Sequence, residues 1–433
     1  MSEIATLPRD RTTRTGAFGT LDRALRNQLI ARLHPLQHGR LVLQDACGTA
    51  QVGTPADQGP QCCVHLQVTN PGFYRAIAAG GSVGAAEAYI HGHWRCDDLV
   101  ALVRLLVRNR DILDGMEGGL ARLGGWVLRG WHALQRNTPQ GSRRNIAAHY
   151  DLGNEFFALF LSPDLMYSSA IWAEPDDTLA AASLRKLERI CRKLELRPDD
   201  RLIEIGTGWG GLALHAARHY GCHVTTTTIS REQHALASER IAAAGLGERV
   251  TVSHTDYRNL RGRYDKLVSV EMVEAIGASY LDTYFRQLGR LVKPDGLALV
   301  QAITIEDHRY ARALRSVDFI KRHVFPGSFI PSINAMLAAK TRSSDFALID
   351  LEDFGPSYAR TLHAWRKRFL ARLPEVRQQG FDERFIRLWD FYLAYCEGGF
   401  LERSTSVVHL LMAKPGYRRT ASLPETERGA RTA

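Results

Sequence analysis

The sequence predicts an α/β protein with a doubly wound, mostly parallel sheet, preceded by a smaller α+β unit. From about residue 146 onward, short apolar runs alternate with helical patterns, which indicates right-handed βαβ crossovers within one sheet. Before that point, one helical pattern is followed by short strand-like runs and then by further helices. The length of 433 residues suits two domains at roughly 100–200 residues each.

The first unit is expected over residues 21–110. Leucines recur every four residues from Leu21 to Leu33 and predict its first helix. Strand-like runs follow at 41–45 and 62–68, with turn residues between them. The rest of the unit is expected to form a turn, a helix, a second turn and a second helix. Residues 1–20 and 416–433 are polar and are expected to be disordered ends.

Residues 111–145 are rich in glycine, yet they carry a regular pattern. Apolar side chains form one stripe, and arginines recur every seven residues on another face, at Arg122, Arg129 and Arg136. A basic amphipathic segment with tryptophans is typical of a helix at a membrane surface. A linker helix packed on the next domain is the alternative, because helices with this much glycine need outside support.

The second unit, residues 146–415, supplies the parallel sheet. Helices are expected at 211–221, 231–245 and 280–292, between strands at 201–206, 223–230, 248–257, 264–272 and 296–305. Two further runs, 346–355 and 406–414, are expected to add antiparallel edge strands. The stretch 306–345 is long, helical and basic, and it is expected to form a lid or a substrate wall.

Charge and cysteine content narrow the classes of function. Lys and Arg number 56 against 46 Asp and Glu, a formal charge of +10 that favours polyanions such as anionic lipid headgroups or nucleic acid. The seven cysteines form no CxxC pair and the histidines show no ligand spacing, so no metal site is expected. The N-terminus lacks the apolar core of a signal peptide, and no run reaches the roughly 18 apolar residues of a membrane-spanning helix. These features predict a cytoplasmic protein with reduced thiols.

A glycine-rich turn carries the strongest single motif. EIGTGWGG, residues 204–211, follows a strand and opens a helix, so its backbone can approach a ligand. A dinucleotide loop is the competing interpretation. Trp209 stands where a pyrophosphate would have to enter, and the next strand ends in TTTTIS without an acid for a ribose. The turn instead resembles the S-adenosylmethionine (SAM) loop of class I methyltransferases.

Six motifs in order make the resemblance specific: YDLGNEFF (150–157), MYSSAIW (166–172), IEIGTGWGGLA (203–213), TTISREQ (227–233), VSVEMVEAIG (268–277) and SYARTLHAW (357–365). Together they resemble the cyclopropane-fatty-acyl-phospholipid synthase family, which includes mycolic-acid cyclopropane synthases and fatty-acyl C-methyltransferases. The resemblance covers roughly residues 20–415 and implies the class I SAM-methyltransferase fold.

The resemblance also implies a set of SAM contacts. Thr and Ser hydroxyls can replace an acid as ribose partners, and an aromatic ring can stack on adenine. The implied contacts are Tyr167, Ser168, Ile203, Glu204, Ile205, Gly206, Thr207, Gly208, Trp209, Gly210, Gly211, Thr228, Ile229, Ser230, Gln233, Asp256, Tyr257 and Arg258.

The implied chemistry is methyl transfer to an unactivated cis-alkene, followed by loss of a proton from the resulting cation. The family resemblance implies that the base is a bound bicarbonate ion, which a Cys, a Glu, a His and a Tyr hold in place. Glu274 and Tyr358 match two of these positions, whereas Ser169 stands at the Cys position and Gln301 at the His position. Ser and Gln still hydrogen-bond an oxyanion but supply no imidazolium charge. Two bases therefore stay open, bicarbonate and Glu274 itself with a pKa raised by burial.

Two other acidic or nucleophilic positions need an interpretation. Glu271 lies three residues before Glu274, and solvation of a loop is the plain alternative for this acidic pair. Cys396 matches a cysteine discussed as catalytic in the family. Because the chemistry needs no covalent enzyme intermediate, a buried structural thiol is the favoured interpretation of Cys396.

The sequence thus predicts a SAM-dependent enzyme that forms cyclopropane rings on unsaturated phospholipid acyl chains. The alternatives are C-methylation to a methyl- or methylene-branched chain, or SAM and lipid binding without turnover. Peripheral association with the inner face of the membrane is expected from the basic charge. A homodimer stays open, and a nucleic-acid substrate is disfavoured because Pro-Pro-Tyr and Pro-Cys motifs are missing from the sequence.

Overall fold

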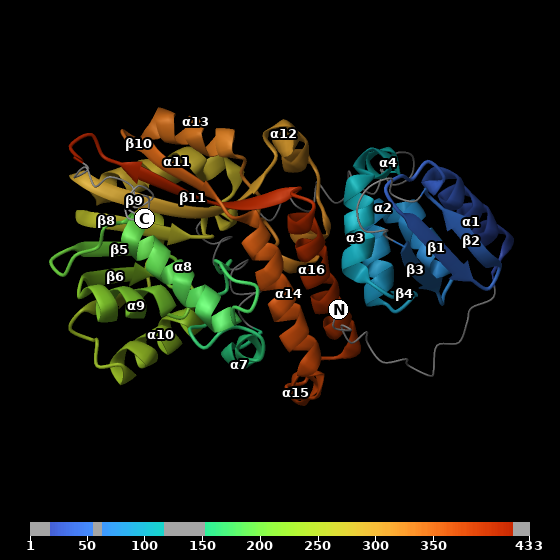
Figure 1. Cartoon of the computed structure of the whole chain (residues 1–433), viewed down its shortest axis with the longest axis horizontal. Helices are drawn as coiled ribbons and strands as arrows, with labels where there is room; N and C mark the ends of the chain where they lie inside the picture. Colours follow the sequence, from blue (N-terminus) through green and yellow to red (C-terminus); the bar gives the residue numbers. More distant parts are fainter. Residues whose placement is uncertain (1–17, 55–62, 117–151, 419–433) are drawn as a thin grey trace, which may run out of the picture.

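The computed structural model describes residues 18–54, 63–116 and 152–418, arranged as two units side by side (Figure 1). The amphipathic pattern predicted for 111–145 lies almost entirely outside the described residues. So do most residues of the two ends that were expected to be disordered. Within the described residues, no helix is long and apolar enough to cross a membrane.

The smaller unit is a four-stranded sheet with helices packed on it. The strand order is β2-β1-β3-β4, with β1 parallel to β3 and the outer pairs antiparallel. The elements are α1 (Thr20–Leu33), β1 (Arg40–Asp45), β2 (Gly48–Val52), β3 (Cys63–Val68), α2 (Gly72–Ile90), β4 (Trp94–Cys96), α3 (Leu99–Arg108) and α4 (Arg110–Met116).

The sequence pattern missed two short strands here and misread one turn. β2 and β4 are short and were not predicted, because each depends on pairing with a neighbour. The turn expected near Gly81 is instead a kink inside α2, where Gly81 has φ 56° and ψ −131°. Glycine adopts this conformation without a Cβ clash, so the helix continues beyond it.

The larger unit is a seven-stranded sheet in the order β10-β11-β9-β8-β5-β6-β7. The five strands from β9 to β7 run parallel, as predicted, and β11 and β10 add antiparallel pairings. One expectation is wrong: of the two antiparallel strands, β10 lies at an edge of the sheet, but β11 lies inside it between β9 and β10. The strands are β5 (Arg201–Ile205), β6 (His223–Thr227), β7 (Val250–Ser253), β8 (Tyr264–Val270), β9 (Val292–Ile305), β10 (Ala347–Asp353) and β11 (Thr405–Ala413).

Helices cover both faces of this sheet, which is the doubly wound arrangement. One face packs on α8 (Leu179–Lys193), α9 (Gly211–Tyr220) and α10 (Arg231–Ala243). The other packs on α11 (Leu281–Leu291) and α13 (Ile333–Ser343). The basic insertion also contains α12 (Asp307–Arg315) and a π-helical turn, η4 (Ile320–Val324).

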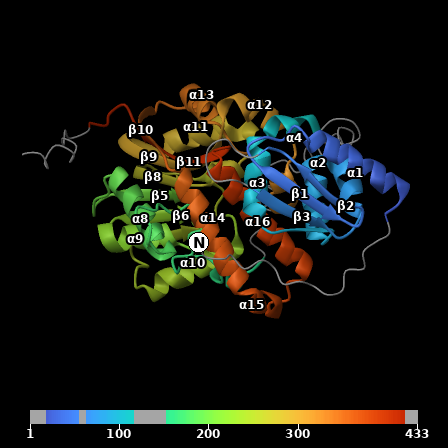
Figure 2. The same ribbon diagram turned by 45° about the vertical axis from the view of Figure 1, so that its right-hand side comes forward.

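Helix α16 (Glu383–Leu401) joins the two units, because it packs directly on α2 and α3 of the smaller unit (Figure 2). Helices α14 (Gly355–Ala371) and α15 (Leu373–Gln378) precede it in the chain, and α7 (Asn154–Ala158) lies before α8. Asp390 of α16 accepts hydrogen bonds from Tyr89 of α2 and Arg366 of α14, at 2.9 and 2.7 Å. One hydrophobic core therefore runs from the smaller unit into the larger one.

Candidate active site

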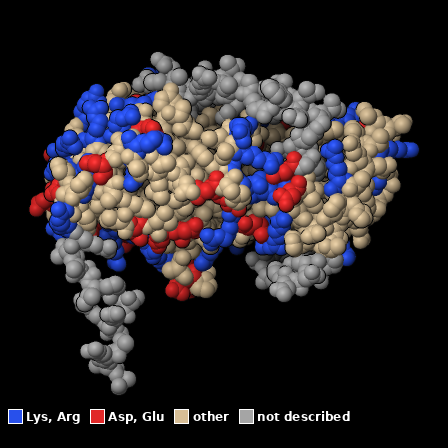
Figure 3. Space-filling model, turned by 90° about the horizontal axis from the view of Figure 1, so that it is seen from above, with Lys and Arg blue, Asp and Glu red and all other residues tan. Residues whose placement is uncertain are grey.

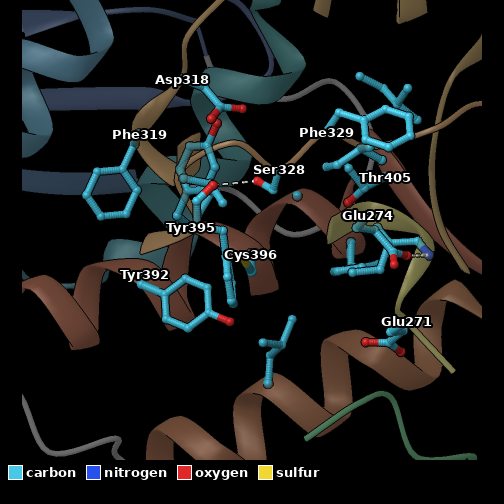
Figure 4. Close-up of a pocket in the computed structure, with 18 of the residues that line it drawn as sticks. Glu271, Glu274, Asp318, Phe319, Ser328, Phe329, Tyr392, Tyr395, Cys396 and Thr405 are labelled. Carbon is cyan, nitrogen blue, oxygen red and sulfur yellow. Dashed lines mark hydrogen bonds between the residues drawn. The ribbon is translucent and has the colours of Figure 1, made fainter. Parts of the chain in front are cut away.

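A large cavity of about 640 Å³ lies between the two units. Its wall includes the glycine turn after β5, the acidic segment after β8, parts of α14 and α16, and apolar side chains of the smaller unit. Figure 4 shows Glu271 and Glu274 on one side of the cavity and Tyr392, Tyr395 and Cys396 of α16 on the other.

The glycine turn has the backbone shape that the sequence required. Gly206, Gly208 and Gly210 have φ values of +101°, +51° and +83°, which L-residues with a Cβ adopt at a cost. A Cβ at Gly211 would meet the carbonyl oxygen of Asp164 at 2.7 Å. The start of α9 can therefore lie close to the chain that precedes it only because this position is glycine.

Most of the implied SAM contacts line the cavity. They are Tyr167, Ser168, Glu204, Ile205, Gly206, Thr207, Gly208, Trp209, Thr228, Ile229, Gln233, Asp256, Tyr257 and Arg258.

Four implied contacts do not belong to the cavity wall. Ile203 lies in the core of the sheet, and Gly210 and Gly211 start α9. Ser230 caps α10, because its hydroxyl accepts the backbone N–H of Gln233 at 3.3 Å.

The side chain of Trp209 does not fill the glycine turn. Its ring packs on Phe157, with ring centroids 5.1 Å apart, and its indole N–H donates to Asn154 at 2.6 Å. The tryptophan thus anchors the turn on the core.

Two polar groups near the turn fit a ligand with the donors and acceptors of SAM. Oε2 of Glu204 and the hydroxyl of Tyr257 are buried without a hydrogen-bond partner among the described residues. Burial raises the pKa of Glu204 to about 8 and outweighs the opposite effects of a hydrogen bond with Thr226 and of the charge of Lys186. Buried polar groups normally have partners, and an ammonium group and an adenine ring nitrogen are partners of the right kind.

Glu271, rather than Glu274, accepts hydrogen bonds from three of the residues that were predicted to hold the base. Its Oε1 accepts the backbone N–H of Ser169 at 2.9 Å and the side-chain amide of Gln301 at 2.7 Å. Its Oε2 accepts the hydroxyl of Tyr358 at 2.8 Å. The arrangement expected around Glu274 is therefore wrong. Ser169 also acts only through its backbone, because its hydroxyl donates to the carbonyl of Ala170.

Glu274 has a different environment three residues away. Its Oε1 accepts the backbone N–H of Ile303 at 2.5 Å, and its Oε2 has no partner among the described residues. Burial, followed by the nearby charge of Glu271, raises the pKa of Glu274 to about 8. Burial also raises the pKa of Glu271, but three hydrogen bonds stabilise its ionised form. The three donors therefore favour the negative charge on Glu271, and the proton of the pair is favoured on Glu274.

Two further residues near Glu271 and Glu274 were not predicted from the sequence. His409 of β11 pairs with Gln301 of β9, and its Nε2 lies 2.9 Å from the Gln301 carbonyl oxygen. Burial lowers the pKa of His409 to about 4, so the ring is neutral and fixes the orientation of the Gln301 amide. Pairing of β9 with β11 places His409 beside Gln301, but no local sequence pattern specifies the register of two strands so far apart in the chain.

Lys186 is the second missed residue. It is fully buried on α8 and donates to the hydroxyl of Ser168 at 2.8 Å. Burial lowers its pKa to about 8, whereas the nearby charges of Glu271, Asp164 and Glu204 favour its protonated form. The sequence offered no signal for it, since a lysine within a helical pattern normally lies on the solvent side.

Cys396 lines the cavity from α16. Burial raises the pKa of its thiol far above the usual range, which disfavours the thiolate that nucleophilic chemistry would need. Within the described parts of the chain, no group of three or more His, Cys, Asp or Glu residues could hold a metal ion.

Comparisons with known proteins agree with this geometry. The sequence model of the family described as mycolic acid cyclopropane synthetase matches residues 137–410. The tuberculostearic acid methyltransferase UfaA1 of Mycobacterium tuberculosis is 34% identical over 95% of each chain. The cyclopropane-fatty-acyl-phospholipid synthase of Escherichia coli strain K12 is 36% identical over 81% of this chain and 87% of its own.

Solved structures agree as well. The cyclopropane synthase MmaA2 from Mycobacterium tuberculosis is 26% identical, with a TM-score of 0.59 over 63% of this chain and 98% of its own. Mycolic acid cyclopropane synthase CmaA1, solved with SAH and CTAB, has the same TM-score and coverage at 27% identity. The chain therefore belongs to the mycolic acid cyclopropane synthetase family, and it is a SAM-dependent methyltransferase with the class I fold that modifies carbon atoms of lipids.

Proposed function

We propose that this enzyme methylates the cis double bond of an unsaturated phospholipid acyl chain and that Glu271 removes the proton. One observation carries the proposal: the Glu271 carboxyl group accepts hydrogen bonds from three donors and lies in a largely apolar cavity that also contains the glycine turn. Relatives named as a tuberculostearic acid methyltransferase and as a cyclopropane-fatty-acyl-phospholipid synthase support the choice of substrate.

The chain's own residues would perform the second half of the reaction. SAM, when bound, supplies an electrophilic methyl group, and its addition to the double bond leaves a cation on the neighbouring chain carbon. That cation must lose one proton before water captures it, which requires a dry cavity and a fixed base. Glu271 would accept this proton, while Tyr358 and Gln301 hold the carboxylate in position.

Bicarbonate does not fit as the base in this chain. Ser169, Gln301 and Tyr358 are three of the four positions expected to hold it, and all three donate to Glu271 instead. A second anion beside that carboxylate would meet like charge in a poorly solvated site. The carboxylate of the protein takes the place of the external anion.

A branched alkene is the product we favour. The base is a fixed side chain, and the relative aligned over 95% of both chains is named as a tuberculostearic acid methyltransferase. A hydride shift to the cationic carbon, followed by loss of a proton from the new methyl group, would give a methylene branch. Direct ring closure is the second candidate, because Glu274 and Tyr358 match the base site of cyclopropane synthases.

The test is product analysis with the purified full-length enzyme. Dioleoylphosphatidylglycerol vesicles are incubated with SAM that carries a ¹³C-methyl group, and the fatty acid methyl esters are analysed by mass spectrometry before and after ozonolysis. A labelled product that ozonolysis cleaves supports the branched alkene. A labelled product that survives shows ring closure, and unlabelled lipid alongside intact SAM binding contradicts the proposed function.

A further inference from the structure

Lys186 is a charged residue for which the proposed reaction has no role so far. On the face of the molecule shown in Figure 3, lysine and arginine side chains lie at the surface beside acidic ones, where water solvates them. The side chain of Lys186, by contrast, is fully buried on α8. Because a buried charge lowers stability unless nearby groups compensate it, its surroundings have to explain its position.

Two side chains of α8 hold the loop of residues 164–169, which we call the 164–169 loop. Ser183 donates a hydrogen bond to Oδ2 of Asp164 at 2.6 Å. Lys186 donates one to the hydroxyl of Ser168 at 2.8 Å. The two donors are three residues apart, so they lie on the same face of the helix. The loop is therefore attached to α8 near both of its ends, once by a neutral group and once by a charged one.

The 164–169 loop contributes to both halves of the site. Tyr167 and Ser168 line the cavity. The next residue, Ser169, donates its backbone N–H to Glu271 at 2.9 Å. The hydrogen bond from Lys186 thus fixes the backbone directly before one of the three donors that hold the Glu271 carboxyl group.

The charge of Lys186 also acts on the carboxyl groups of the site. Burial raises the pKa of Glu271, whereas its three hydrogen bonds and then the charge of Lys186 lower it. A buried cation at this position therefore favours the ionised form of Glu271. The titratable groups that interact electrostatically with Lys186 are Asp164 of the loop, Glu204 of β5, Glu271 after β8 and His409 of β11.

The other titratable groups facing Glu271 differ in whether they titrate near neutral pH. Burial raises the pKa of Tyr358 and Tyr392 well above the ordinary value of a phenol, and burial lowers the pKa of His409 to about 4. Burial and the charge of Glu271 raise the pKa of Glu274 to about 8. A change of charge at residue 186 should therefore appear in the titration of the two carboxyl groups and leave the phenols and the imidazole unchanged.

We propose that Lys186 is a positioning residue for the base: through Ser168 it fixes the backbone donor of Ser169, and its charge keeps the Glu271 carboxylate ionised. Lys186 is not among the residues that line the cavity, so it acts through these neighbours and does not touch the substrate. The consequence for turnover rests on the proposed function, in which Glu271 removes the proton. The effect on the pKa of Glu271 does not.

The charge is tested with three substitutions of Lys186 in the full-length enzyme. Lys186→Met and Lys186→Gln remove the charge, and the glutamine retains N–H donors. In both variants the acidic limb of kcat is expected to move to higher pH by about one unit, because the ionised form of Glu271 loses a favourable charge. On that limb kcat should be about tenfold below the wild-type value. Lys186→Arg keeps the charge and is expected to keep the limb at its wild-type position.

Ser183→Ala is the matched control on the same helix. It removes the other hydrogen bond between α8 and the 164–169 loop but no charge. Its Tm is expected to fall while the acidic limb of kcat stays in place. A limb that moves as far in Ser183→Ala as in Lys186→Met would mean that the position of the loop, and not the charge of Lys186, controls Glu271.

A measurement without turnover separates this inference from the proposed function. Infrared difference spectroscopy follows the carbonyl stretch of protonated Glu271 during a pH titration, and the band is assigned by its loss in Glu271→Gln. Its midpoint is expected to rise by about one unit in Lys186→Met and Lys186→Gln. If the midpoint rises but Glu271→Gln retains wild-type turnover, the inference holds and the proposed base is wrong. If the midpoint and the acidic limb stay at their wild-type values in both variants, Lys186 has a structural role alone and the inference is overturned.

Discussion

The glycine turn and the base site lie on the same cavity, but they are built in different ways. The turn is local: residues 204–211 shape it, and Trp209 fixes it to Asn154. The base site draws on four separated segments, because Ser169, Gln301 and Tyr358 all donate to Glu271. A local motif can be recognised from its residues, whereas the site assembled over long distances depends on which carboxylate its donors reach.

The difference also appears in the electrostatics. The glycine turn depends on backbone geometry, and Oε2 of Glu204 beside it has no hydrogen-bond partner among the described residues. At the base site, hydrogen-bond donors stabilise the ionised form of Glu271, whereas Oε2 of Glu274 has no hydrogen-bond partner among the described residues. Substitutions at the base site should therefore change turnover at constant SAM affinity, and substitutions at the turn should change stability and SAM affinity together.

Glu271→Gln gives the largest expected effect. The amide cannot accept a proton, so kcat should fall by about 10³-fold, the range found when a general base is lost. SAM affinity, measured by titration calorimetry, should stay within about twofold of the wild-type value, because the glycine turn is unchanged. Glu274→Gln is the matched control and is expected to lower kcat by about tenfold at most, since burial and the charge of Glu271 raise the pKa of Glu274 to about 8 and favour its protonated form. A Glu274 variant that is the more impaired of the two would assign the base to Glu274.

Gly211→Ala should act at the turn and not at the base. The added Cβ meets the carbonyl oxygen of Asp164 at 2.7 Å and the sulfur of Met166 at 2.9 Å. Crowding of this kind should lower the free energy of unfolding by about 1–3 kcal/mol and weaken SAM binding. Gly247→Ala, where a Cβ meets nothing within 4 Å, is the control. Thermal unfolding and calorimetry measure both quantities, and an unchanged Tm in Gly211→Ala would contradict the tight packing described here.

Tyr358→Phe should shift the pH dependence of turnover. Glu271 must be ionised to act, so kcat falls as the pH drops through its pKa, which burial has raised. Loss of the Tyr358 hydrogen bond removes a group that favours the ionised form, and the acidic limb should move to higher pH by about one unit. At a pH on this acidic limb, kcat of Tyr358→Phe should be about tenfold lower than kcat of the wild-type enzyme. A shift toward lower pH, or none, would mean that Tyr358 does not act through Glu271.

Cys396→Ser should have the smallest effect. The thiol lies in the cavity wall with a strongly raised pKa and is not required to ionise. We expect kcat to change by less than about threefold, from altered packing alone. Alkylation of wild-type Cys396 would fill part of the cavity and block it sterically. The serine variant separates this steric effect from a chemical role of the thiol. A loss of activity as large as that of Glu271→Gln would restore a catalytic role for the thiol.

The sequence was most informative where a pattern carries its own geometry. Alternating strands and helices predicted the parallel sheet, and the glycine-rich residues 204–211 predicted a turn between a strand and a helix, in which the structure gives Gly206, Gly208 and Gly210 positive φ values. It was least informative where two distant strands must pair. The place of β11 inside the sheet, and with it the contact between His409 and Gln301, follows from a register that no local pattern specifies.

The acidic pair shows why the base could not be chosen in advance. Glu271 and Glu274 are three residues apart, so motif position alone favoured Glu274. Glu271 has a positive φ of 47° directly after β8, a backbone conformation uncommon for a residue with a side chain. It is therefore Glu271 that reaches the donors on the loop before α8, on β9 and on α14.

The amino-acid sequence by itself determined the fold class, the glycine turn and the family, because each depends on residues close together in the chain or on motifs in a fixed order. The tertiary structure alone decided which carboxylate the donors meet, that Lys186 is buried beneath them, and that one cavity joins the smaller unit to the base site. The physical reason is that hydrogen bonds and burial depend on distances between segments far apart in the chain, and those distances exist only after the sheet and the two units have packed together.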